Sequence, residues 1–402
     1  MTKKAAAERL LTVALTALAF ILPISIAGTN MALALVLAGL LARLASGEPL
    51  EWRRARIPVT WCLCLYCGAA ILTSVTGVSP SVSLHNLPKD FHKLCAFLIL
   101  LLAFRATPAR RLTIALALGF VFVAAAGIAQ SVLDSYRRFL VYGEFWVWIR
   151  ARAFVHPVTY GELLGFGLLG GLAFLLKPPT PAPGRLPAQV FLVLAGSALL
   201  LSQTRAAFLG VLAGFAAMCA AEPALRRWLK WGFAAAVLSV ALMEALPTHR
   251  SLIASLRDNG VAIGANPHLN RFILWDVAWR IFKDHPWLGV GPANYATVFA
   301  DYHQGLIEGQ RVWGAAHNVF LHQLAERGLA GLTALAALWG VLLTRAWQRA
   351  RARPCAWNLW SLAATTAFLF MNLTENAFQN EQVTTLFLFI WTRAESRQHA
   401  QP

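Results

Sequence analysis

Eight arginines are predicted to lie on the outer face of a membrane, where such residues are uncommon. Lys and Arg normally collect in the cytoplasmic loops of membrane proteins. A guanidinium group binds a phosphate through two parallel hydrogen bonds. A group of arginines on the outer face therefore indicates a bound anion, and a lipid-linked diphosphate is a natural candidate. The eight are Arg137, Arg138, Arg150, Arg152, Arg205, Arg271, Arg280 and Arg311.

His317 is predicted to accept a proton beside these arginines. The apolar segment that starts there is interpreted as a helix that re-enters the membrane after a long loop. A helix N-terminus disfavours a protonated imidazole, so a neutral His317 would be available as a general base. The alternative is a purely structural histidine. His322 either supports His317 or only packs, and both Asn318 and His322 are predicted to contact substrate.

Arg205 is predicted to lie in a tight turn between two spans, in the sequence SQTR at residues 202–205. An arginine is costly to place at that depth, which favours a functional role over a side chain that snorkels to water. Arg271 begins a predicted loop helix. Catalytic roles are therefore assigned to His317, Arg205 and Arg271. Four further arginines are predicted to bind substrate: Arg150, Arg152, Arg280 and Arg311.

Other chemistries lack their sequence patterns. The chain contains no phosphate-binding P-loop, dinucleotide fingerprint or nucleophile elbow. His317 and His322 do not have the spacing or the Glu of the zincin pattern, and no Asp-x-Asp pair offers a cradle for a divalent ion. We therefore expect neither a metal nor a cofactor. Arginine would supply the positive charge that a diphosphate leaving group needs.

These residues must be held by membrane-spanning helices. Of the 402 residues, 58% are hydrophobic and 13% are charged, whereas soluble domains carry about 25% charged residues. The predicted fold is an all-α polytopic membrane protein with about twelve spans and one long outer loop that contains helices. The spans cover roughly residues 10–27, 30–45, 58–76, 91–105, 111–131, 158–176, 188–203, 206–221, 229–246, 317–343, 356–374 and 381–393.

The distribution of Lys and Arg predicts that both termini lie in the cytoplasm. Most of the 35 Lys and Arg then fall in inner segments. The net charge of +17 is mostly this inner belt, which can attract anionic lipids of the membrane. No basic soluble domain is present that would bind nucleic acid. None of the six cysteines falls in the large outer loop, so no disulfide framework is expected.

Three regions follow from this topology. Residues 1–246 hold nine spans, residues 247–316 form the long outer loop, and residues 317–402 hold three spans and a cytoplasmic tail. Near residues 134–157 an interfacial helix on the outer side is predicted to lie in the headgroup plane. Its apolar face would consist of Phe139, Tyr142, Trp146 and Ile149.

Within the long loop, a helix is predicted from Asn270, acting as its cap, to about Lys283. Its apolar stripe would consist of Phe272, Trp275, Trp279 and Phe282. The sequence GVG at residues 289–291 follows. Its glycines allow a sharp turn and a close backbone approach, and they are only a weak signal for phosphate binding.

Three motifs together resemble those of the bacterial O-antigen ligase and O-antigen polymerase superfamily. The first is SQTRAA at residues 202–207, similar to the family's T-x-S-R-G/A turn, although Gln203 and Thr204 stand where Ser or Gly is common. The second runs from Arg271 through HP at residues 285–286 to GVG at residues 289–291. The third is HNVFL at residues 317–321, followed by ERG at residues 326–328. With the many spans and the single long loop, the resemblance covers most of the chain.

The resemblance implies an inverting glycosyltransferase with a GT-C-like architecture in the bacterial inner membrane, with its active site at the periplasmic face. The donor would be O-antigen glycan on undecaprenyl diphosphate, and the acceptor would be lipid A–core. His317 would take the proton of the attacking hydroxyl, while Arg205 and Arg271, with Arg152, would bind the diphosphate. An O-antigen polymerase or a protein O-oligosaccharyltransferase is the alternative within the superfamily. A flippase that moves the same lipid without breaking its bonds is the alternative from another class.

Overall fold

The computed structural model describes residues 2–104, 108–143, 149–178, 185–245 and 269–396. Every element in these ranges is a helix, apart from one isolated bridge between Ile307 and Gln310. The first half holds α1 (Lys3–Ile21), α2 (Ile26–Ala45), α3 (Pro58–Thr76), α4 (Pro80–Ala103), α5 (Ala109–Tyr142), α6 (Pro157–Leu176) and α7 (Arg185–Ser202). The second half holds α8 (Arg205–Ala221), α9 (Leu229–Ala245), α11 (Asn270–Asp284), α12 (Tyr295–Tyr302), α13 (Val319–Ala352), α14 (Ala356–Met371) and α15 (Glu381–Ser396). Three short 3₁₀ helices are η1 (Trp52–Ala55), η2 (Pro223–Trp228) and η3 (Ala377–Gln379).

Each segment predicted to span the membrane overlaps a helix, which confirms the all-α fold, although the first segment, residues 10–27, runs past the end of α1 into α2. Six of the described helices are long and apolar enough to cross a bilayer by their length and composition. They are α2, α3, α5, α6, α7 and α13, and α8 is a shorter apolar helix. The chain is therefore an α-helical membrane protein.

The region near residues 134–157 differs from the prediction of a separate interfacial helix. Helix α5 continues without a break to Tyr142, and it ends at Gly143, which adopts φ 68°. A left-handed glycine at this position is a common way to end a helix. Residues 149–156 are not helical, and Trp146 of the predicted apolar face lies outside the described residues. The aromatic and basic residues before Gly143 therefore belong to the end of a long spanning helix.

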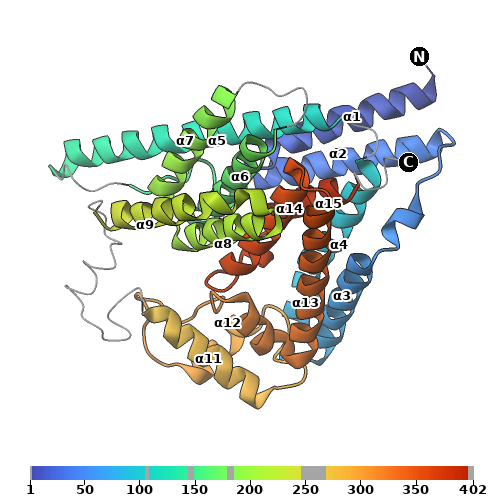
Figure 1. Cartoon of the computed structure of the whole chain (residues 1–402). Helices are drawn as coiled ribbons and strands as arrows, with labels where there is room; N and C mark the ends of the chain where they lie inside the picture. Colours follow the sequence, from blue (N-terminus) through green and yellow to red (C-terminus); the bar gives the residue numbers. More distant parts are fainter. Residues whose placement is uncertain (1, 105–107, 144–148, 179–184, 246–268, 397–402) are drawn as a thin grey trace.

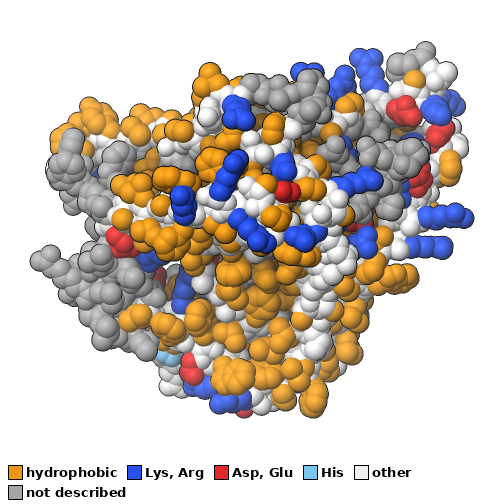
Figure 2. Space-filling model, in the orientation of Figure 1, with side chains coloured by type: hydrophobic (Ala, Val, Ile, Leu, Met, Phe, Trp, Pro, Cys, Tyr) orange, Lys and Arg blue, Asp and Glu red, His pale blue; other side chains and the backbone are white. Residues whose placement is uncertain are grey.

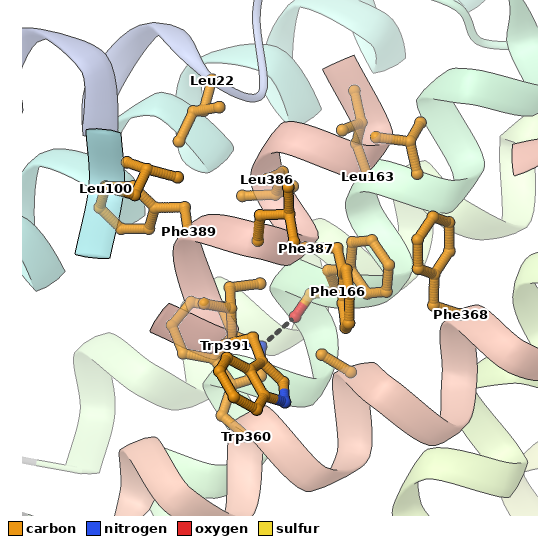
Figure 3. Close-up of a cluster of buried hydrophobic side chains, with 14 of the residues drawn as sticks. Leu22, Leu100, Leu163, Phe166, Trp360, Phe368, Leu386, Phe387, Phe389 and Trp391 are labelled. Carbon is orange, nitrogen blue, oxygen red and sulfur yellow. Dashed lines mark hydrogen bonds between the residues drawn. The ribbon is translucent and has the colours of Figure 1, made fainter. Parts of the chain in front are cut away.

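The core of the bundle surrounds α14 and α15. Helix α14 packs against α6, α8, α13 and α15, and nearly the whole length of α15 is buried. Figure 3 shows the aromatic rings of this core gathered together, and the Nε1 atom of Trp360 donates a hydrogen bond of 2.8 Å to the carbonyl oxygen of Phe166. The loop helices α11 and α12 lie at one end of the bundle (Figure 1). Lys and Arg side chains gather toward the other end, beside a broad apolar surface (Figure 2).

Helix α11 has the predicted bounds but buries a different face. Its buried residues are Leu274, Val277, Ala278 and Ile281, together with Asn270. Of the predicted aromatic stripe, Phe272 and Trp279 are exposed. Asn270 does not cap the helix, because the N-cap residue is Leu269 and the Asn270 amide points to Glu308, 3.5 Å away. The aliphatic flank packs into the small core that α11 forms with α12 and α13, so Phe272 and Trp279 are left on the exposed flank.

Helix α13 is broken at Gly328, whose backbone adopts φ 57° and ψ −154°. The break frees backbone groups that a continuous helix would pair internally. Residues 286–291 pair with them instead. The amides of Leu329 and Ala330 donate to the carbonyls of Pro286 and Trp287, at 2.8 and 3.1 Å. In return, residues 290 and 291 donate to the carbonyls of residues 325 and 326, at 3.0 and 2.8 Å.

The GVG sequence at residues 289–291 therefore has a structural role, because it connects the loop to the break in α13. A Cβ atom on Gly289 would lie 2.3 Å from the carbonyl carbon of Glu326, and one on Gly291 would lie 2.8 Å from the Oγ of Ser83. Both glycines also have positive φ, of 65° and 96°. The glycines allow two backbones to approach, and they hold the first part of α13, which follows His317, against residues 286–291.

Replacing Gly289 with Ala should destabilise the fold by about 1–3 kcal/mol, because the added methyl meets backbone atoms and the residue keeps a strained φ. Thermal unfolding in detergent micelles measures this. Gly314→Ala is the matched control in the same loop, since a Cβ there meets nothing within 4 Å. Equal unfolding temperatures for the two variants would contradict the proposed role of Gly289.

A buried polar network joins α13 to α3 and α4. The Nη2 atom of Arg327 donates to the Oδ2 atom of Asp90 at 2.7 Å, and the Nζ atom of Lys93 lies 3.4 Å from the other oxygen. Tyr66 donates to the same carboxylate at 3.1 Å. All three charged side chains are only 3% exposed. One carboxylate thus pairs with two buried cations, and Arg327 further donates to Gln323 at 2.8 Å.

Asp90→Ala should cost about 3–5 kcal/mol, because it leaves two cations buried without their carboxylate. The unfolding temperature in micelles should fall sharply. Asp276→Ala is the control, since it breaks the exposed Asp276–Arg280 pair and should cost less than about 1 kcal/mol. A small effect for Asp90→Ala would mean that water reaches this network.

Candidate functional site

The candidate site lies where the long loop meets the bundle. Helix α11 packs on α13, and the turn that follows α14 reaches both the start of α11 and the residues before α13. Three chain segments that are far apart in sequence therefore meet there, near the loop end of the molecule (Figure 1).

Glu375 is the centre of this site. The Nδ1 atom of His317 lies 3.0 Å from its Oε2 atom. Arg271 pairs with its Oε1 atom through Nη2 and donates through Nη1 to the carbonyl oxygen of Thr374. The Glu375 side chain is 9% exposed, whereas His317 and Arg271 are 33% and 37% exposed. The carboxylate is therefore buried behind a ring and a guanidinium group that both reach the outside.

The charge of Glu375 is stabilised by these two partners. Burial alone would raise the pKa of the Glu375 carboxyl. The hydrogen bond from His317 and the positive charge of Arg271 act in the opposite direction and outweigh burial, so the pKa of Glu375 is lowered. An ionised Glu375 can hold the imidazole of His317 in one orientation.

The lowered pKa of Glu375 makes folding stability depend on pH. Ionised Glu375 contributes stability that is present above the unfolded carboxyl pKa, about 4.3, and this contribution is lost as the pH falls through the lower folded pKa. The difference in unfolding temperature between the native protein and Glu375→Gln should therefore shrink as the pH is lowered below about 4.3. A difference that stays constant would mean that Glu375 is not ionised in the folded protein.

His317 lies just outside the helix that was predicted to carry it. Helix α13 begins at Val319, and Asn318 is its N-cap, with the Oδ1 atom accepting from the amides of Phe320 and Leu321 at 3.0 and 3.1 Å. Asn318 therefore has a structural role in addition to the predicted contact with substrate. His317 adopts φ 49°, and the ring of Trp313 lies edge-on to its ring at 5.9 Å.

Arg205 is the first residue of α8, on the same side of the bundle as Glu375. Helices α8 and α14 are antiparallel neighbours, because Gly210 packs on the carbonyl of Ala367 and Gly214 on that of Ala363. The start of α8 thus lies beside the end of α14, which leads into Glu375. The Nη2 atom of Arg205 pairs with Glu244 of α9 at 2.9 Å, and the Arg205 side chain is 40% exposed.

Arg150 and Arg152 flank the Arg205 turn. The Nε atom of Arg150 donates to the carbonyl of Ser202 at 2.7 Å, and its Nη2 atom donates to the Oγ1 of Thr204 at 3.3 Å. Arg150 therefore braces the turn that precedes Arg205. Arg152 is exposed. The residue before it, Ala151, donates a backbone hydrogen bond of 3.0 Å to the carbonyl of Leu201, close to the same turn.

The structure does not bring Arg280, Arg311 and His322 into contact with Glu375. Arg280 lies nine residues beyond Arg271 on α11, about 13 Å along the helix axis, and pairs with Asp276 at 2.7 Å. Arg311 is exposed in the loop before His317. His322 is buried, with its Nε2 atom 3.4 Å from Glu326 and its ring against that of Tyr295 at 5.4 Å. His322 thus lies in α13 and packs against Tyr295 of α12.

Sequence reasoning missed Glu375 and Glu162. Glu375 is the only acidic residue in the turn between two apolar segments, on the side assigned to His317, and that isolation was a usable signal. Glu162 lies in α6, is 2% exposed, and interacts electrostatically with Glu375. A glutamate within an apolar span is itself a signal of function.

A comparison with protein families finds a model that is similar to part of the chain. A family model described as O-antigen ligase matches residues 190–336. A search of curated proteins finds no significant match. The matched residues run from α7 into α13, contain Arg205, Arg271 and His317, and end before Glu375. Residues 190–336 are therefore similar to the domain that defines the O-antigen ligase family.

Proposed function

We propose that this chain is an O-antigen ligase that transfers O-antigen glycan from undecaprenyl diphosphate to lipid A–core at the periplasmic face of the bacterial inner membrane. The observation that carries the proposal is the arrangement of His317, Glu375 and Arg271, which places a histidine–carboxylate pair next to a partly exposed arginine. The family match supports a lipid-linked glycan as substrate.

His317 serves as the general base. When its Nδ1–H donates to Glu375, the Nε2 atom of the neutral ring carries the lone pair. That atom takes the proton of the acceptor hydroxyl as the oxygen attacks the anomeric carbon. Ionised Glu375 then stabilises the imidazolium that forms, as carboxylates do in other histidine-based sites.

Arginine balances the charge that develops on the leaving diphosphate. The bond between the anomeric carbon and the diphosphate oxygen breaks on the face opposite to the attack, so the configuration inverts. Arg271 is already held at the site by Glu375, and Arg205 lies on the same side of the bundle, 40% exposed. Arg152 is exposed near the turn that leads to Arg205. Each can offer paired donors to a phosphate.

The membrane placement is part of the proposal. About twelve helices would cross the inner membrane in a GT-C-like architecture, with both termini in the cytoplasm and residues 247–316 in the periplasm. Both substrates would then diffuse laterally to a site at the outer boundary of the bilayer, beneath the loop helices.

Reconstitution tests this function. The purified protein in liposomes receives undecaprenyl-diphosphate-linked O-antigen and lipid A–core, with EDTA present throughout, and the products are separated on a gel. A ladder of glycan on lipid A–core supports the ligase. Glycan lengthened on undecaprenyl diphosphate, with lipid A–core unchanged, would make the chain a polymerase. Activity that requires added Mg²⁺ would contradict the proposed use of arginine alone.

A flippase is distinguished in the same vesicles. Donor that changes leaflet while every glycosidic bond remains intact would replace the proposal with transport. An acceptor peptide in place of lipid A–core tests the protein oligosaccharyltransferase alternative.

A further inference from the structure

Asn372 follows the last residue of α14 and begins the turn that carries Glu375. It is fully buried. Its backbone amide and its Nδ2 atom both donate to the carbonyl oxygen of Phe368, at 3.1 and 2.8 Å. One half of the side-chain amide therefore closes the last turn of α14, and the Oδ1 atom is left to bond outside the helix.

The Oδ1 atom of Asn372 closes the turn around Glu375. It accepts a hydrogen bond of 2.8 Å from the backbone amide of Phe378, six residues further along the chain. Phe378 is held firmly, because its buried ring packs against those of Tyr66 and Trp339, with centroids 5.6 and 6.0 Å away. Glu375 lies midway between the two bonded residues, so the closed turn sets the position of its carboxylate.

The backbone of Asn372 also holds the segment that carries His317. Its carbonyl oxygen accepts a hydrogen bond of 2.9 Å from the amide of Val319, the first residue of α13. His317 precedes Val319 by two residues. His317 and Glu375 are 58 residues apart in sequence, and Asn372 is bonded to the segments of both.

We infer that Asn372 is a positioning residue, which holds Glu375 against the imidazole of His317. The 3.0 Å contact between those two side chains requires the two segments to keep a fixed separation. An amide side chain suits this task, because it offers an acceptor and donors together. Without that acceptor, the buried backbone amide of Phe378 would lose its partner, which is costly. The inference rests on the proposed function for the role of the pair in catalysis.

Asn372→Leu tests the inference, with Asn358→Leu as its matched control. Leucine has the same branched shape as asparagine and no polar atoms. Asn358 is 5% exposed in the first turn of the same helix, and its Nδ2 atom donates to the carbonyls of Arg349 and Arg353 at 3.4 and 2.9 Å. Each substitution removes hydrogen bonds from a buried asparagine at one end of α14, but only Asn372 belongs to the turn at the site.

Glycan transfer in liposomes gives the first readout. Both variants should lower the unfolding temperature. Asn372→Leu should also lower kcat of the folded fraction about 10- to 100-fold, with little change in the apparent KM of the donor, because a displacement of reacting groups by about 1 Å costs rate on that order. Asn358→Leu should leave kcat unchanged. Equal values of kcat for the two variants would overturn the inference.

A gentler pair of variants covers the case in which Asn372→Leu does not fold. Asn372→Ser and Asn358→Ser each keep a hydroxyl group in place of the amide. The loss of kcat should again be confined to the substitution at Asn372, and equal kcat values for the two serine variants would overturn the inference.

The proton on the ring of His317 gives a readout that does not depend on transfer. NMR spectra of protein in micelles, with isotope-labelled histidine, show which ring nitrogen carries the proton. The His317 signals are identified by their loss in His317→Ala. The proton should lie on Nδ1 in the native protein and in Asn358→Leu. It should be shared between Nδ1 and Nε2 in Asn372→Leu, because Glu375 would no longer hold it.

This second result keeps the inference separate from the proposed function. A change of tautomer in Asn372→Leu supports the positioning role even where no glycan is transferred and the proposed function fails. An unchanged tautomer in Asn372→Leu would make Asn372 a helix cap alone and overturn the inference.

Discussion

His317→Ala should lower the rate of glycan transfer by about 10²–10⁴-fold, the usual contribution of a general base. The substitution removes the Nε2 lone pair and leaves Glu375 paired only with Arg271. Initial rates in liposomes at saturating donor and acceptor measure the effect on kcat. The apparent KM of the donor should change little, because the diphosphate is bound by arginine and not by the imidazole.

The control for this substitution is His322→Ala, one turn further along the same segment. His322 is buried against Tyr295 and Glu326, so its loss should lower the unfolding temperature rather than kcat of the folded fraction. Near-normal transfer by correctly inserted His317→Ala protein would show that another group accepts the proton.

Glu375→Gln should reduce kcat on the order of 10²–10⁴-fold, by analogy with other histidine–carboxylate pairs. A glutamine can still accept a hydrogen bond from Arg271 through its amide oxygen. Its NH₂ group, however, would face Nδ1 of His317 as a donor, which moves the ring proton to Nε2. The nitrogen that faces the substrate would then carry a proton and could not accept one.

The double substitution separates this mechanism from simple loss of structure. If Glu375 acts through His317, the double variant should be no slower than His317→Ala, because groups that act as one unit are not additive. Glu381→Gln is the matched control, since Glu381 bonds Asn30 at 3.2 Å at the start of α15. If the losses of kcat in the two single variants multiply in the double variant, Glu375 acts independently of His317. Its role would then be to bind Arg271.

The joint between α13 and the loop illustrates what the sequence left undecided. The glycines at 289 and 291 are equally compatible with a phosphate-binding turn and with two backbones in contact. Only the folded chain shows Glu326 and Ser83 within reach of their missing Cβ atoms. In the same way, the sequence of α11 shows an apolar stripe of aromatic residues, but the structure buries the aliphatic flank beside it. The choice between two apolar flanks depends on the shape of the partner helix, which the stripe does not encode.

The sequence by itself determined where the helices lie and at which end of the bundle the main catalytic candidates were expected. Hydropathy is a local property, since each span must satisfy its own backbone hydrogen bonds within the bilayer. Its pattern therefore placed every predicted span over at least part of a helix and assigned Arg205, Arg271 and His317 to one side. The tertiary structure decided which of them meet. The Glu375 carboxylate, 58 residues beyond His317 and 104 beyond Arg271, joins two of them, while Arg205 pairs with Glu244. Such pairings depend on how α8, α11, α13 and α14 pack around one another. This packing is fixed by contacts between distant segments, and such contacts produce no periodic pattern in the local sequence.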